Sequence, residues 1–82
     1  MPHFVVTWTE VALDQYLALD VEQRKLIDRR LVMLAGAPDG DGCRYDPGSD
    51  TWTATDESSA GFIVYTYRND GLRLIVLRLV YV

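Results

Sequence analysis

The sequence predicts a single small α+β domain spanning residues 1–82, with the element order β-α-α-β-β-β. Two observations support this prediction. Apolar residues recur at helical spacing in the first half of the chain, whereas in the second half they alternate or run together as strand residues do. A chain of 82 residues has room for one hydrophobic core. We therefore expect a small, mainly antiparallel four-stranded sheet packed against a two-helix hairpin.

The first strand is predicted from His3 to Trp8, because Phe4, Val6 and Trp8 alternate with less apolar or smaller residues. A helix follows directly. Thr7 and Glu10 have the spacing of a capping box, in which each side chain accepts a hydrogen bond from a backbone amide at the helix start. The expected apolar stripe of this helix consists of Ala12, Tyr16 and Leu19, widened by Leu13 and Leu17.

A second helix is predicted to begin near Asp20, with Gln23 completing another capping box. Its apolar face consists of Ile27, Leu31 and Leu34, and its other positions are mostly charged. The tight junction between the helices predicts an antiparallel hairpin. The basic residues of this helix form the only positive patch that the sequence indicates, which we interpret as a solvated face or an RNA contact: Arg24, Lys25, Arg29 and Arg30.

Residues 36–50 are rich in Gly, Pro, Asp and Ser and are expected to form one long loop without a regular element. Three strands are predicted after it, over residues 51–56, 62–68 and 72–82. A two-residue turn before the last strand would place Arg68 opposite Arg73, so a three-residue loop with left-handed Gly71 is preferred. In that register Arg68 faces Leu72 and Arg78 faces Phe62.

This register predicts which residues share each face of the sheet. The helices are expected to cover one bulky set, namely Ile63, Tyr65, Tyr67, Ile75, Leu77, Leu79 and Tyr81, together with Trp52 and Ala54. The opposite face is expected to carry Thr53, Thr55, Phe62, Val64, Thr66, Arg68, Leu74, Val76, Arg78, Val80 and Val82. Since this second face is half apolar and half polar, it suits a groove covered by a partner.

Composition excludes several classes of function. Eight Lys and Arg against twelve Asp and Glu give a net charge of −4, which is opposite to the usual charge of a nucleic-acid binder. One cysteine, Cys43, and one histidine, His3, allow neither an internal disulfide nor a Cys/His zinc site within a monomer. No cofactor and no metal are expected. The chain has no apolar run long enough to span a membrane, and we expect it in the cytoplasm.

Three stretches of the chain resemble the RelE/ParE toxin superfamily of bacterial toxin–antitoxin systems. They are Val6-Thr7-Trp8-Thr9-Glu10-Val11-Ala12-Leu13, Ser58-Ser59-Ala60-Gly61-Phe62-Ile63-Val64-Tyr65 and Ile75-Val76-Leu77-Arg78-Leu79-Val80-Tyr81. The resemblance implies a small sheet backed by a helical hairpin, with an open groove. In the RNase members that groove docks at the ribosome, and basic groups cleave mRNA without a metal.

The resemblance also indicates where this chain departs from the family. It places Phe62 at the family's catalytic arginine, and Thr53 and Thr55 at its paired lysines. A phenyl ring and hydroxyl groups supply no positive charge to a phosphate. The remaining candidates for catalysis are Arg78 and Tyr81, and the expected substrate or partner groove contains Thr53, Thr55, Phe62, Arg68 and Arg44.

The expected function is therefore that of a toxin-family component of a type II system, neutralised by a cognate antitoxin. Its target would be ribosome-bound mRNA if it cleaves RNA. The alternative is a non-catalytic binding module, either a gyrase-inhibiting ParE-like protein or a decayed toxin. A homodimer and a toxin–antitoxin hetero-oligomer are both compatible with the sequence.

The sequence contains two further acidic motifs. Asp39, Asp41, Asp46 and Asp50 suggest calcium, but they lack the spacing of an EF-hand and its closing glutamate, which favours a solvated loop. Asp56 and Glu57 lie beside Ser58 and Ser59 on a predicted hairpin tip, where neighbouring side chains diverge. Neither motif predicts a site.

Overall fold

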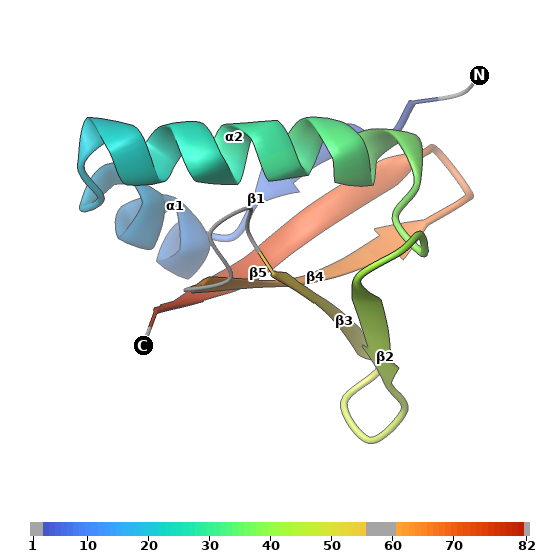
Figure 1. Ribbon diagram of the computed structural model, residues 1–82. Helices are drawn as coiled ribbons and strands as arrows, with labels where there is room; N and C mark the ends of the chain where they lie inside the picture. Colours follow the sequence, from blue (N-terminus) through green and yellow to red (C-terminus); the bar gives the residue numbers. More distant parts are fainter. Residues whose placement is uncertain (1–2, 56–60, 82) are drawn as a thin grey trace.

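The structure, a computed structural model, describes residues 3–55 and 61–81. Its elements are β1 (Val5–Trp8), α1 (Glu10–Leu17), α2 (Val21–Gly36), β2 (Cys43–Asp46), β3 (Thr51–Thr55), β4 (Gly61–Arg68) and β5 (Arg73–Tyr81). Figure 1 shows two layers, with both helices on one side of a twisted sheet and the β2–β3 hairpin extending beyond them. We call the helix-covered side of the sheet the inner face and the opposite side the outer face. The predicted α+β class is confirmed.

The sheet has five strands, one more than predicted, in the order β1-β5-β4-β3-β2. The first strand pairs in parallel with the last, and every other pairing is antiparallel. The strand missed from sequence is β2, which lies inside the segment that was expected to be an irregular loop. It pairs with β3 across a four-residue connection, with Tyr45 opposite Trp52. The expectation failed because turn-forming residues flank β2 on both sides and leave only four residues for the strand itself.

The start of α1 differs from the prediction by two residues. Thr9, not Thr7, is the N-cap, and its side-chain oxygen accepts a hydrogen bond from the Ala12 amide at 3.2 Å. Thr7 stays in β1, where it pairs with Ile75. The Thr9 hydroxyl also donates to the Leu77 carbonyl at 2.7 Å, which ties the start of the helix to β5. The predicted capping box fails because strand pairing holds Thr7 in the sheet.

The apolar stripe of α1 is narrower than predicted. Ala12 is fully buried, and Tyr16 and Leu19 pack against the core. Leu13 and Leu17 are instead 42% and 59% exposed. A helix of eight residues lying on the edge of the sheet buries only one line of side chains, so the flanking leucines remain in solvent.

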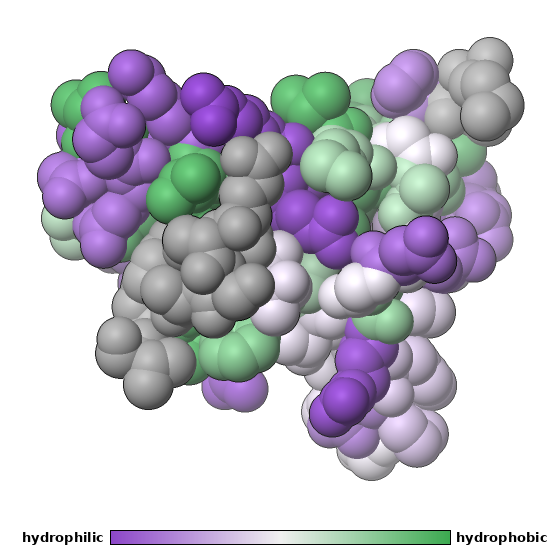
Figure 2. Space-filling view, in the orientation of Figure 1, coloured by the Kyte–Doolittle hydropathy of each residue, from purple (hydrophilic) through white to green (hydrophobic). Residues whose placement is uncertain are grey.

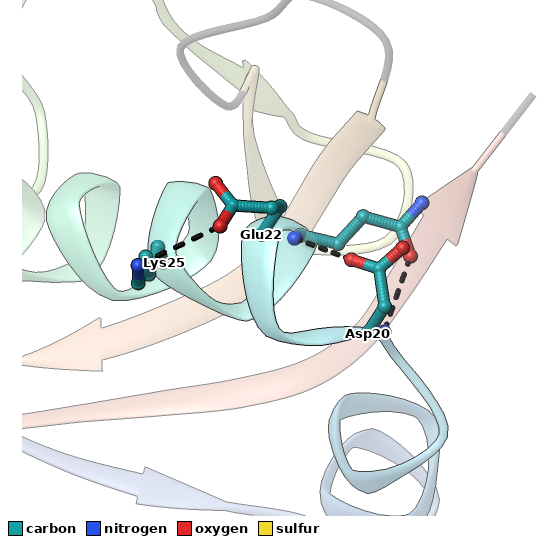
Figure 3. Close-up of polar contacts among 4 residues, drawn as sticks. Asp20, Glu22 and Lys25 are labelled. Atoms are coloured by element: carbon teal, nitrogen blue, oxygen red, sulfur yellow. Dashed lines mark hydrogen bonds and ion pairs between the residues drawn. The ribbon is translucent and has the colours of Figure 1, made fainter.

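The predicted start of α2 is confirmed in full. Asp20 accepts a hydrogen bond from the Gln23 amide at 2.8 Å, and the Gln23 side chain accepts one from the Asp20 amide at 3.5 Å. Figure 3 shows this reciprocal pair together with the exposed Lys25–Glu22 ion pair at 3.6 Å. The predicted apolar face is also confirmed, since Ile27, Leu31 and Leu34 are all buried.

Arg30, which was assigned to the solvated face of α2, is buried with 9% exposure. Its guanidinium donates to the Asp41 carbonyl at 3.1 Å and lies 3.7 Å from the Cys43 sulfur, while its Nε has no hydrogen-bond partner. Its long side chain fastens the loop after α2 to the helix. The positive patch predicted on this helix therefore loses one of its four members.

The predicted register of the last hairpin is wrong at the turn. Arg68 pairs with Arg73, which leaves a four-residue loop from Asn69 to Leu72. Gly71 adopts the predicted left-handed conformation with φ 78°, but Leu72 is also left-handed with φ 48°. Two exposed like charges cost less than about 1 kcal/mol, whereas burying a Leu or Val side chain contributes about 1.5–3 kcal/mol. Packing of the strand therefore outweighs this repulsion.

A register shift at Val64/Tyr65 then inserts one extra residue into β5. Before this bulge, Leu74 and Val76 lie on the inner face, which inverts the predicted facing of this part of the strand. After it, Leu79 pairs with Ile63 on the inner face, as predicted. Arg78 consequently pairs with Val64 rather than with Phe62. The extra residue is Leu77, which has no partner in β4.

The core lies between the helices and the inner face of the sheet. Tyr65 is fully buried there, and its hydroxyl donates to the Pro38 carbonyl. The fully buried or nearly buried core residues are Ala12, Ile27, Leu31, Leu34, Ala54, Ile63, Tyr65, Leu74, Val76 and Leu79. Among the described residues, no helix has the length and apolar character needed to cross a membrane. The two helices cover one side of the sheet and leave the outer face open.

Candidate functional site

The outer face of the sheet carries most of the side chains predicted to form a groove. Strand partners share a face, so the pairings place Arg44, Thr53, Val64 and Arg78 in one row across four strands. A second row contains Thr55, Phe62 and Val80. The prediction that Thr53, Thr55 and Phe62 share a face is confirmed.

A pocket of about 220 Å³ lies at the β2–β3 end of the outer face. Its lining consists of Gly42, Arg44, Thr53, Thr55 and Phe62. The lining therefore combines one aromatic residue, two threonines and an exposed arginine. Four of the residues predicted for the groove therefore come together in one cavity.

Arg78 lines a neighbouring pocket of about 320 Å³ with Ser49, Thr51, Val64 and Leu77. Val64 also pairs with Thr53, whose side chain lines the first pocket. The two arginines at the ends of this row are separated by three strand spacings, or roughly 14 Å between their Cα atoms. The two pockets thus form one shallow surface with a guanidinium at each side.

Two more arginines extend this surface toward the β4–β5 turn. Tyr67 and Leu74 pair on the inner face, so the next pair, Arg68 and Arg73, lies on the outer face. Both are exposed. Arg68 was predicted for the groove and lies on the correct face, but it lines neither pocket. Arg73 was missed, because the predicted loop was one residue too short.

We call Arg44, Arg68, Arg73 and Arg78 the arginine face. These are four of the eight Lys and Arg residues of the chain. Within the described residues, none of the four has an ion-pair partner, and Asp46 is the one acidic residue in the strands. That carboxylate accepts hydrogen bonds from the Gly48 amide and the Ser49 hydroxyl at 2.9 Å. The acidic chain therefore presents a locally cationic surface.

This arrangement corrects the expectation that α2 carries the only positive patch. On α2, Lys25 pairs with Glu22, and Arg24 donates to the Leu19 carbonyl at 3.0 Å. The arginine face was missed because its members are separated by up to 34 positions in the sequence and meet only through strand pairing. Alternation of polar and apolar residues along a strand shows which side chains face outward. The last strand is apolar at most positions, so its sequence does not show which of its side chains do so.

The described lining of the two outer-face pockets includes none of the other residues that the sequence singled out. The backbone of Tyr81 pairs with Gly61. Asp56, Glu57, Ser58 and Ser59 lie outside the described residues. Among the described residues, no group of three or more His, Cys, Asp or Glu side chains is placed to hold a metal ion. The arginine face is suited to bind and neutralise anionic groups through its guanidinium groups.

The tyrosine pKa values report the environment on the other side of the sheet. Burial raises the pKa of the Tyr65 phenol far above its usual value, and the hydrogen bond with Cys43 adds to this effect. The pKa of Tyr16 is raised chiefly by its hydrogen bond to Asp28, at 2.7 Å. These neutral phenols belong to the core and its rim and not to the arginine face.

No family model and no curated protein sequence matches the chain. Solved structures do match it. The chain is similar to the intact RelBE toxin–antitoxin complex of E. coli, with a TM-score of 0.82 and 19% identity over 98% of this chain and 96% of that one. It is also similar to the RelBE2 toxin–antitoxin complex of Mycobacterium tuberculosis, with a TM-score of 0.82 and 14% identity over the full length of both chains.

A third similar structure is a YoeB/ParE toxin from Agrobacterium tumefaciens, with a TM-score of 0.77 and 20% identity over 94% of this chain and 96% of that one. Identities this low establish the architecture and not the chemistry. The predicted resemblance is confirmed at the level of the fold. With its helical hairpin, its sheet order and its open outer face, this chain has the RelE-type toxin fold.

Proposed function

We propose that this chain is the toxin of a type II toxin–antitoxin pair and that it inhibits translation by binding mRNA at the ribosome. The observation that carries the proposal is the arginine face on a RelE-type fold, open to solvent and without ion-pair partners among the described residues. RNA is a polyanion, and phosphate contacts from arginine supply most of the sequence-independent affinity for it. The site of action is the cytoplasm, where ribosomes are.

Arg78 and Arg44 are the residues proposed to contact phosphate. They stand at the two sides of the outer-face row, and each lines a pocket. A planar guanidinium binds phosphate oxygens in a bidentate manner and neutralises charge that develops on them. Between them lie Thr53, which is partly exposed and offers a hydroxyl to a sugar or a base, and the buried Val64.

The same surface is proposed to receive the cognate antitoxin. The solved RelBE structures of E. coli and M. tuberculosis are toxin–antitoxin complexes, which supports a partner of this kind. Four exposed arginines, Arg44, Arg68, Arg73 and Arg78, lie on the same face as the partly exposed Phe62 and Leu77. An antitoxin segment that combines acidic and apolar residues would cover both kinds of side chain.

The first test is inducible expression of the chain without any antitoxin. We expect growth arrest and a fall in protein synthesis, and we expect Arg78→Ala to relieve both. Lys25→Ala is the matched control, because it removes one positive charge from an exposed position on α2 and leaves the outer face intact. Arrest with unaltered mRNA and normal protein synthesis would point to a protein target, and unimpaired growth would remove the toxin assignment.

The second test measures binding of single-stranded RNA by fluorescence anisotropy at several salt concentrations. Each phosphate contact on a single strand contributes about 0.7 to the slope of log K against log salt. Arg78→Ala and Arg44→Ala are each expected to lower that slope by about 0.7, whereas Lys25→Ala leaves it unchanged. Mapping of mRNA ends in a translating extract, with and without Arg78→Ala, then reports whether binding leads to cleavage.

A further inference from the structure

A second exposed surface lies on the inner side of the sheet, beyond the end of α2. Four aromatic rings form a continuous row there, from Phe4 to Tyr67, Trp52 and Tyr45. Neighbouring ring centroids are 5.5, 5.7 and 5.2 Å apart. Figure 1 shows the β2–β3 hairpin, which carries Trp52 and Tyr45, extending past the helices. We call these four residues the aromatic row.

Most of the aromatic row packs against the core on one side and is partly exposed to solvent on the other. Phe4, Trp52 and Tyr67 pack against the core, and Tyr45 is 43% exposed. A pocket of about 300 Å³ adjoins the row, with Phe4, Tyr67 and Pro38 in its lining. In Figure 2 the protruding β2–β3 hairpin shows residues of intermediate hydropathy beside strongly hydrophilic ones. The rings are thus fixed in position with part of their surface accessible.

Carboxylates stand at both ends of the aromatic row. Asp50 accepts a hydrogen bond from the Tyr45 hydroxyl at 2.6 Å, and this contact raises the pKa of that phenol. Asp39 lines the adjoining pocket, and its charge contributes to raising the pKa of Tyr67. No Lys or Arg lines this pocket, and the nearby Arg30 is buried. The surface therefore combines aromatic rings with negative charge, opposite to the arginine face.

We propose that the aromatic row binds a short segment of a partner protein that carries arginine or lysine side chains. A cation over a tryptophan or tyrosine ring is stabilised by the ring quadrupole by about 0.5–1 kcal/mol at an exposed site, and Asp39 and Asp50 complement its charge. The same carboxylates disfavour phosphate, so nucleic acid is not the ligand. Because the aromatic row and the arginine face lie on opposite sides of the sheet, this proposal stands independently of the proposed toxin function.

The test uses a short peptide with two arginines separated by glycine, added to the isotopically labelled intact chain and followed by NMR. The indole signal of Trp52 is expected to shift, and that of Trp8 is expected to stay in place. Trp8 packs against Tyr16 under α1 and serves as an internal control. A peptide with citrulline in place of arginine keeps the shape and lacks the charge, and it is expected to bind at least 3-fold more weakly.

Two variants test whether the carboxylate beside Tyr45 contributes to peptide binding. Asp50→Asn retains an acceptor for Tyr45 and tolerates the left-handed backbone at φ 54°, and it is expected to weaken peptide binding about 2- to 5-fold. Asp14→Asn on α1 removes the same charge at an exposed position and is expected to leave binding unchanged. Both should retain the wild-type melting temperature. Equal binding of the citrulline peptide would overturn the proposal, as would a larger shift of Trp52 on addition of single-stranded RNA.

Discussion

The two faces of the central sheet are made by alternate residues of the same strands, yet they are governed by different forces. On the inner face, Ile63 and Tyr65 are fully buried beneath the helices. On the outer face, the row that runs through Val64 includes Arg78, Arg44 and Thr53, which contact solvent. Packing therefore accounts for the inner face, whereas the outer face places like charges together and gains no packing for them. The proposed RNA binding would give these side chains a role that packing does not.

The last strand, β5, contributes side chains to both faces of the sheet, but its alternation between the faces is interrupted by a bulge. Up to Val76 it alternates regularly, and the bulge at Leu77 then places two successive residues, Leu77 and Arg78, in the lining of one outer-face pocket. Beyond the bulge, Leu79 returns to the core. Bulges redirect side chains in this way and are frequent beside functional sites. The irregularity thus enlarges the outer surface without loss of the inner packing.

The largest expected effect tests the inner face. Ile27→Ala is expected to lower the free energy of unfolding by about 2–5 kcal/mol, because it leaves a cavity at a fully buried position. Val80→Ala on the outer face, at 38% exposure, is expected to change it by less than about 0.5 kcal/mol. Urea denaturation monitored by circular dichroism measures both. Similar losses for the two variants would mean that the outer face is also packed, by a second copy or otherwise.

A smaller effect on the free energy of unfolding is expected from the buried hydroxyl group of Tyr65 on the inner face. Tyr65→Phe removes the hydrogen bond to the Pro38 carbonyl and is expected to cost about 1 kcal/mol at pH 7. The pKa of Tyr65 is raised in the folded chain above 10.0, so its protonated form stabilises the fold fully below pH 10 and this contribution is lost as the pH rises further.

The difference in unfolding free energy between wild type and Tyr65→Phe should therefore shrink between pH 9 and pH 11. Tyr45→Phe is a comparison variant, since that phenol is exposed and its pKa is raised chiefly by the hydrogen bond to Asp50. If the difference stays constant over this range, Tyr65 ionises as readily in the folded chain as in the unfolded one, and its burial has been misjudged.

The smallest effect tests whether the arginine face is retained against stability. Arg73→Glu converts the like-charged pair with Arg68 into an opposite pair and is expected to raise the free energy of unfolding by about 0.2–1 kcal/mol at low salt. The gain should decline as salt is added. The same change should weaken RNA binding. A variant that is less stable, or that binds RNA as tightly as the wild type, would contradict this view of the outer face.

Local signals were sufficient for most elements. The capping box at Asp20 and the spacing of Ile27, Leu31 and Leu34 predicted α2 correctly, because both depend on residues within a few positions of one another. The prediction failed where strand pairing competes with a local motif. Thr7 has the right spacing for a cap but remains in β1, and β2 was hidden by turn-forming residues on both sides.

The sequence by itself determined the α+β class and the order of the main elements, since each element follows from periodicity along its own segment. It also predicted Thr53, Thr55 and Phe62 on one face, on the condition that Trp52 and Ala54 point to the helices, and the strand pairing confirms that shared face. The tertiary structure decided which side chains of β5 face outward. It also brought four arginines, from three different strands, together on the outer face. The last strand is apolar on both faces, so alternation carried no information about its orientation. The orientation of these side chains is set by the four-residue turn before β5 and by the bulge at Leu77. Pairing with β1 and packing against the helices hold the strand in that orientation.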